Sequence, residues 1–163
     1  MKAMDRFLAG IVIGVLALVA SALALALLRP APSYLPDDTP EAVAHNYLLA
    51  LRQGDEGRAY GYLASELAGR PRTLDEFSRD LRAFSWRPGG PEESSSVTIE
   101  PARLEGGRAT VRVRETVFYP SGLFSSEYTN TFSMRLRQEQ GGWRIVASDA
   151  YWAACWQDIQ GCR

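Results

Sequence analysis

The chain has 163 residues, 46% of them hydrophobic, with 18 basic and 19 acidic side chains, and this length suits one compact domain. The near-zero net charge lacks the basic excess that phosphate backbones require, so we expect no nucleic-acid partner. One histidine, His45, and two cysteines are too few for a tetrahedral zinc site, and we expect neither a metal nor a cofactor. The cations are 17 arginines and Lys2, a bias that suggests a bacterial source.

Residues 7–28 form an apolar segment in which no side chain is charged and only Ser21 is polar. Such a helix is about 33 Å long, which matches the hydrocarbon core of a bilayer. Lys2, Arg6 and the amino terminus precede the segment, so the positive-inside rule places residues 1–6 in the cytoplasm. The sequence thus predicts a single-pass protein of the cell membrane, held in the bilayer by residues 7–28, with an extracytoplasmic domain.

A cleaved signal peptide is the alternative, because small residues with the spacing of a cleavage site stand near the end of this segment: Ala22, Ala24 and Ala26. A signal peptide has an apolar region of about 7–15 residues, whereas here leucines continue to Leu28, which favours an uncleaved anchor. Gly10 and Gly14 form one G-x-x-x-G spacing, so a weak homodimer is a further option.

The remaining chain begins with a spacer and three helices. Residues 29–40, RPAPSYLPDDTP, are rich in proline and predict an extended stalk over 29–39. Apolar spacing with N-capping residues then predicts helices over 40–53, 55–67 and 73–84. The first is capped by Thr39 and ended by Gly54, and the third begins with the capping box TLDE.

The second half alternates apolar and polar residues with a period of two, after a predicted loop at 88–96. This pattern predicts four strands: 97–104, 108–119, 127–138 and 142–149. Their short connections require antiparallel neighbours, so the strands form a meander with one face toward the helices. We therefore expect an α+β domain over 40–149, followed by an aromatic tail over 150–163 that holds both cysteines.

Two stretches resemble a known superfamily. Residues 39–67, TPEAVAHNYLLALRQGDEGRAYGYLASEL, are similar to the opening helix pair of the nuclear-transport-factor-2-like (NTF2-like) superfamily, which has a cystatin-like fold, and GGWRIVAS is similar to its last strand. The resemblance covers most of residues 39–149. It implies a strongly curved sheet wrapped around the helices as a cone with an open pocket. Members include enzymes, binding modules and membrane-anchored assembly subunits, so the role stays open.

Strand alternation sorts the side chains into a buried and an exposed face. Three polar residues fall in the apolar rows of the buried face: Glu115, Asn130 and Asp149. Buried polar groups need partners or water, so we take these three as pocket candidates, together with helix tyrosines that could bond them: Tyr47, Tyr60 and Tyr62. Two of the three are carboxylates, which could transfer protons if they lie close together. Enzymes of the superfamily commonly pair Asp with His, but His45 lies off the apolar stripe of its helix.

The exposed face of the predicted sheet is basic. It carries Arg112, Arg114, Arg135, Arg137 and Arg144. Held near a membrane, this face could touch anionic headgroups or an acidic partner protein. The simpler interpretation is a solvated sheet face.

Cys155 and Cys162 lie in the part assigned outside the cell, where an oxidising compartment permits a disulfide. Trp152, Cys155, Trp156 and Ile159 have helical spacing, however, and seven residues of helix would separate the two Cα atoms by about 10 Å. A disulfide requires roughly 4.4–6.8 Å. We expect the bond, with any helix confined to about one turn before the chain folds back at Gly161.

The sequence lacks a nucleophile elbow, a zinc-protease motif and a phosphate loop. We therefore expect a membrane-anchored binding domain without catalytic activity, which engages an envelope protein or a small ligand. One alternative is an enzyme that uses the inner-face carboxylates on a small substrate. Another is a scaffold subunit of a membrane transport or secretion assembly.

Overall fold

The computed structural model describes residues 2–27, 32–85, 94–121 and 124–162, which divide into two compact units, Met1–Ser33 and Tyr34–Arg163. The first unit holds one helix, α1 (Lys2–Leu27), in which the Ser21 hydroxyl donates to the carbonyl oxygen of Ala17 at 2.8 Å. Within the described ranges, no helix combines the length and the apolar character needed to cross a membrane.

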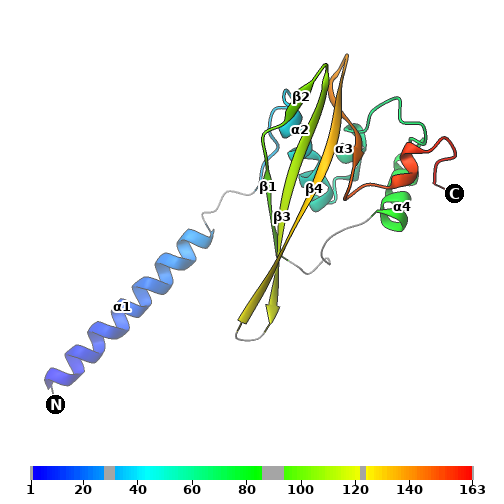
Figure 1. The fold of residues 1–163 in the computed structure, drawn as a ribbon. Coiled ribbons are helices and arrows are strands. Elements are labelled where there is room, and N and C mark those ends of the chain that lie inside the picture. Colours follow the sequence, from blue (N-terminus) through cyan, green and yellow to red (C-terminus); the bar gives the residue numbers. More distant parts are fainter. Residues whose placement is uncertain (1, 28–31, 86–93, 122–123, 163) are drawn as a thin grey trace. The chain divides into compact units, whose positions relative to one another are not determined.

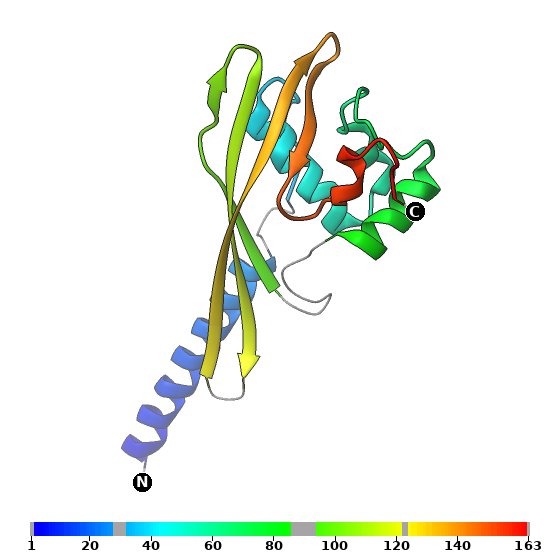
Figure 2. The same ribbon diagram turned by 45° about the vertical axis from the view of Figure 1, so that its right-hand side comes forward.

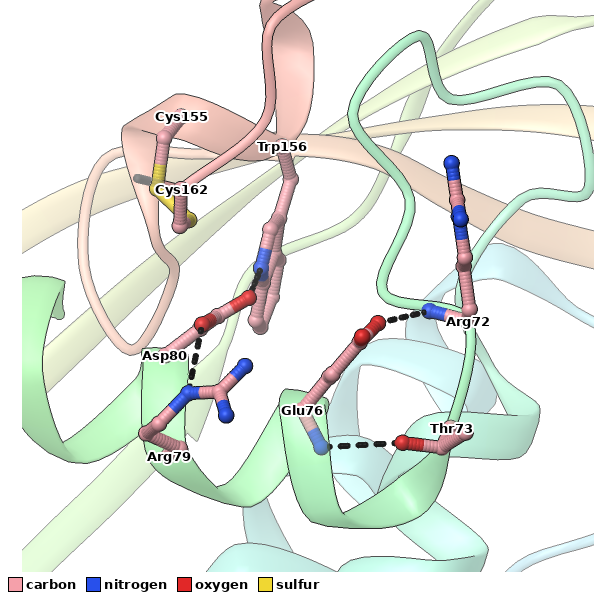
Figure 3. Close-up of polar contacts among 8 residues, drawn as sticks. All are labelled: Arg72, Thr73, Glu76, Arg79, Asp80, Cys155, Trp156 and Cys162. Atoms are coloured by element: carbon pink, nitrogen blue, oxygen red, sulfur yellow. Dashed lines mark hydrogen bonds and ion pairs between the residues drawn. A yellow bond between two sulfur atoms is a disulfide. The ribbon is translucent and has the colours of Figure 1, made fainter.

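The second unit contains three further α-helices, α2 (Pro40–Gln53), α3 (Glu56–Gly61) and α4 (Leu74–Phe84). The predicted caps of α2 are present, because Thr39 Oγ1 accepts from the Ala42 N–H at 3.1 Å and Gly54 ends the helix with φ 72°. The N-cap of α4 is also present (Figure 3): Thr73 Oγ1 accepts from the Glu76 N–H. The second bond of the predicted capping box is shifted by one residue, since the Glu76 carboxylate accepts from the N–H of Arg72 and not of Thr73.

The predicted second helix is too long, since α3 ends at Gly61 and not at residue 67. The following residues leave the helix to bond strand β5 (Gly142–Ser148): the Ile145 N–H donates to the Tyr62 carbonyl at 2.8 Å, and the Ala64 N–H donates to the Ile145 carbonyl at 2.9 Å. Gly57 and Gly61 give a helix here little intrinsic stability, so these long-range backbone bonds replace its last turns.

Five strands form the sheet, in place of the predicted four: β1 (Ser94–Ile99), β2 (Arg103–Glu105), β3 (Arg108–Ser121), β4 (Phe124–Glu139) and β5. The order is β1-β3-β4-β5, all antiparallel, with β2 paired to β3 next to β1. The predicted strand 97–104 is split because Pro101 lacks an N–H. The Ala102 N–H donates instead to the Glu41 carboxylate at 2.7 Å.

Strands β3 and β4 are longer than predicted. They stay paired from Arg108 opposite Arg137 to Ser121 opposite Phe124, so most of the predicted loop at 120–126 is strand. Residues 122–123 lie outside the described residues, as do residues 88–93 of the predicted loop at 88–96, whose last three residues belong to β1. The far ends of β3 and β4 form a two-stranded arm, at the bottom of Figures 1 and 2.

The hydrophobic core lies between the helices and one face of the sheet (Figure 2). Side chains from every layer are fully buried there, including Tyr47, Leu63, Phe77, Val111, Val113, Met134, Ile145 and Trp156. Trp156 stacks on Phe77 with ring centroids 5.2 Å apart, and the edge of Trp152 meets Trp156 at 4.8 Å. The aromatic tail is therefore part of the core, which extends the domain beyond residue 149.

The predicted disulfide is present. Cys155 and Cys162 are bonded with their Cα atoms 5.0 Å apart, because the helical turn is limited to a 3₁₀ segment, Ala154–Gln157, and the chain reverses at Gly161 with φ 62°. Figure 3 shows the bond beside Trp156, whose indole N–H donates to the buried Asp80 carboxylate at 3.1 Å.

Removing this bond is expected to lower the free energy of unfolding by about 2.5 kcal/mol, the chain-entropy value for a loop of about eight residues. Urea unfolding of the double variant Cys155→Ala/Cys162→Ala measures the loss. Mass spectrometry of the wild-type chain serves as the control, since the bond removes two hydrogens. Equal unfolding midpoints would contradict the expected role of the bond.

Part of the predicted stalk belongs to the domain, which begins at Tyr34 and not at residue 40. The side-chain amide of Asn46, fully buried on α2, accepts from the Leu35 N–H at 2.8 Å and donates to the Leu35 carbonyl at 2.7 Å. The Arg58 guanidinium lies 3.6 Å from the centre of the Tyr34 ring. These contacts hold residues 34–37 on the helices, while stalk residues 28–31 lie outside the described residues.

Candidate functional site

Two of the three predicted inner-face polar residues lie together. Glu115 on β3 is 1% exposed, and Asn130 stands directly opposite it on β4, half-buried. Asp149 follows β5 and is exposed. The predicted pair of inner-face carboxylates is therefore wrong.

A β-bulge explains the position of Asp149. Leu136 pairs with Ile145, whereas Met134 pairs with Ser148, so β5 has one residue more than β4 across this step. An extra residue reverses the alternation of faces, which turns Ser148 inward and Asp149 outward. Asp149 lies just beyond the end of β5, where its carboxylate accepts a hydrogen bond from the Ser133 N–H of β4 at 3.0 Å.

The carboxylate of Glu115 is bound from one side. Its Oε1 accepts from Arg52 Nη2 at 3.2 Å and from the Tyr151 hydroxyl at 2.7 Å. Arg52 lies in the last turn of α2 and also donates to the Ser95 hydroxyl of β1 at 2.6 Å. A buried carboxylate needs such a partner, because an isolated charge in the protein interior is costly.

Tyr151 reaches this carboxylate from a strained backbone. Its φ is 56°, in the left-handed region that a non-glycine residue adopts at a cost of about 1–3 kcal/mol. The hydroxyl of Tyr47, buried on α2, donates to the Tyr151 carbonyl at 2.6 Å, and the Tyr151 ring packs against Phe132 at 5.9 Å. Of the helix tyrosines, Tyr47 thus joins the site through Tyr151.

Sequence reasoning missed both residues that bind Glu115. Arg52 follows Leu48 by four residues and so lies on the apolar stripe of α2, a position at which a cation signals a buried anion. No local pattern marks Tyr151, because only the course of the tail brings it to the sheet.

One donor and one acceptor in the site have no partner within the described structure. Glu115 Oε2 and Asn130 Nδ2 are both buried without a hydrogen bond, and their residues face each other across β3 and β4. Such groups normally bind water or a ligand. We define Arg52, Glu115, Asn130 and Tyr151 as the Glu115 cluster, a candidate site for a small polar group that both donates and accepts.

The other two tyrosine candidates have different partners. The Tyr60 hydroxyl donates to the Pro71 carbonyl at 2.9 Å, under the Arg70 guanidinium. The Tyr62 hydroxyl donates to the Asp37 carboxylate at 3.0 Å, and burial raises the pKa of Tyr62. Neither Tyr60 nor Tyr62 is therefore part of the Glu115 cluster. His45, the only histidine in the sequence, is half-buried on α2.

The opposite sheet face has the expected arginines. Arg112 and Arg114 bind Glu100, with nitrogen–oxygen distances of 3.8 and 2.9 Å. Arg137 lies 2.9 Å from both Glu66 and Glu139, and the hydrogen bond to Glu139 raises the pKa of Arg137. Arg135 is exposed, and Arg144 bonds the Trp143 carbonyl. Two further arginines, which strand alternation in the sequence did not assign to it, lie on this face: Arg103 and Arg108.

Comparisons with known proteins identify the fold. No protein-family model matches the chain, and no curated protein matches it significantly. A solved structure described as a calcium/calmodulin-dependent protein kinase type II association domain, from Thiobacillus denitrificans, has a TM-score of 0.51 and 16% identity, covering 74% of this chain and 97% of that one. The two share one fold.

Two further solved structures are similar to this chain. A ketosteroid isomerase-like protein from Erwinia carotovora has a TM-score of 0.45 and 17% identity, covering 66% of this chain and 88% of that one. An NTF2-like protein with a cystatin-like fold, from Novosphingobium aromaticivorans, has a TM-score of 0.42 and 18% identity, covering 66% and 75%. At these identities the likeness concerns the fold alone.

Proposed function

We propose that this chain is a membrane-anchored extracytoplasmic binding domain. The observation that carries the proposal is the sequence of residues 7–28, which contains no charge and follows two cations. The bond from the Ser21 hydroxyl to the Ala17 carbonyl is consistent with a bilayer, where each polar group must find a partner inside the protein.

A binding role fits the polar groups of the domain better than acid–base catalysis. Glu115 is bound to Arg52 and Tyr151, while Asp149 bonds the edge of β4, so the two carboxylates do not share a site. The helices cover one face of the sheet and leave the arginine-bearing face open to partners (Figure 2).

Reporter fusions after Arg163 test the topology. A reporter that is active only outside the cytoplasm is expected to give full signal, and a reporter that is active only in the cytosol is expected to give none. The same fusions to a variant without residues 7–28 serve as the control and are expected to reverse. Signal from the cytosolic reporter on the full chain would overturn the proposal. The intact mass of the membrane-bound chain separates an anchor, which retains residues 1–28, from a cleaved signal peptide.

A further inference from the structure

Arginines from three strands surround a groove on the open face of the sheet. The groove has a volume of about 380 Å³ and is lined in part by Arg103, Arg108, Thr110, Arg135 and Arg137; we call it the arginine groove. Strand register aligns these residues in two neighbouring rows across the sheet, Arg103–Thr110–Arg135 and Arg108–Arg137–Arg144.

The charges of these rows are only partly neutralised. Glu66 and Glu139 bind Arg137, and Glu105 of β2, which also lines the groove, stands opposite Arg108. Arg103, Arg108 and Arg135 nevertheless form no ion pair with any residue that the structure describes. Like charges directly opposite each other destabilise a sheet, and Arg108 stands opposite Arg137. An anion in the groove removes this repulsion. Phosphate oxygens suit guanidinium groups best, because the planar fork donates two parallel hydrogen bonds.

The amino-terminal segment of the domain passes the end of the sheet that holds the groove. The Asp37 carbonyl oxygen lies 3.8 Å from the point where a side chain at Gly142 would begin, and Gly142 pairs with Glu139, two residues from Arg137. Residues 28–33 span at most about 21 Å when fully extended. With residues 7–28 in the bilayer, a connection of this length keeps the domain that carries the groove close to the membrane surface.

We propose that the arginine groove binds the phosphate groups of anionic phospholipids in the membrane that anchors the chain. This inference rests on the anchoring proposed above. The short tether favours the lipid over an acidic protein, because it raises the effective concentration of lipid phosphate around the domain.

Arginine footprinting of the full chain in vesicles tests the inference. The chain is reconstituted in phosphatidylcholine, alone or mixed with phosphatidylglycerol, and its arginines are modified with phenylglyoxal and quantified by mass spectrometry. Labelling of Arg103, Arg108 and Arg135 is expected to fall about fivefold in the anionic vesicles, the effect of attraction to an anionic surface. Arg79 and Arg82 on α4, whose side chains are 66% and 63% exposed, are internal controls with unchanged labelling.

Two variants of equal charge separate the groove from general attraction. In Arg108→Gln/Arg135→Gln, the remaining Arg103 is expected to be labelled equally in both vesicles. In Arg79→Gln/Arg82→Gln, Arg103 is expected to keep its protection. Loss of protection in both variants would overturn the assignment to the groove.

Further outcomes distinguish the tether, the lipid and a free anion. Flotation in a density gradient measures whether the chain stays with the vesicles. If it floats with neither kind of vesicle, both the proposed anchoring and the proposed lipid ligand are overturned. A chain that floats with both vesicles, with equal arginine labelling in each, leaves the anchoring intact and overturns the lipid inference, as expected for an acidic protein partner. Equal protection by inorganic phosphate in neutral vesicles would assign the groove to a free anion instead.

Discussion

Replacing Gly69 by alanine is expected to destabilise the domain by about 3 kcal/mol or more, through overpacking and a lost hydrogen bond. A Cβ atom at this position would lie 2.4 Å from the carbonyl oxygens of both Cys155 and Asp158. The Gly69 N–H also donates to the Trp156 carbonyl at 3.0 Å, so the backbone cannot withdraw without losing this bond. The opposing segment is closed by the disulfide, which restricts its movement.

Urea unfolding measures this effect, with Gly57→Ala as the matched control. A Cβ atom at Gly57, within α3, has no neighbour closer than 3.9 Å. Alanine is expected to stabilise that helix by about 0.5–1 kcal/mol. A Gly69→Ala chain as stable as the wild type would show that the tail does not pack on residue 69.

The second large effect is expected for Arg52→Ala, which leaves the Glu115 carboxylate buried without its cation. Breaking a buried ion pair from one side costs about 3–5 kcal/mol. We expect a value near 3 kcal/mol, because the Arg52 side chain is 38% exposed and water already screens part of the interaction. The double variant Arg52→Ala/Glu115→Gln is expected to recover at least half of this loss, because a neutral amide still accepts the bond from Tyr151.

Arg82→Ala is the control for this prediction. Arg82 pairs with Glu56 at 3.5 Å on the surface, where side-chain exposures are 63% and 34%. An exposed pair of this kind contributes about 0–1 kcal/mol. If thermal and urea unfolding place Arg52→Ala as close to the wild type as Arg82→Ala, Glu115 is not a buried anion that depends on Arg52.

Local signals in the sequence determined several elements of this domain. Helices α2 and α4 begin at the predicted capping residues, because a cap is a bond between a side chain and a backbone group three residues away. The burial of Val111, Val113 and Glu115 follows from strand alternation, which is also local. The disulfide followed from having two cysteines seven residues apart in a chain expected to be exported.

Only the tertiary structure decided the composition of the candidate site. The bulge between β4 and β5 removed Asp149 from it, and a one-residue offset of this kind depends on how two strands pair, which neither strand encodes alone. Tyr151 entered the site because the tail folds under the sheet to bury Trp156. Likewise, α3 stops at Gly61 because Tyr62 and Ala64 bond Ile145, more than eighty positions away. Contacts between residues so distant in sequence leave no periodic signal, so hydrophobic pattern and caps cannot reveal them.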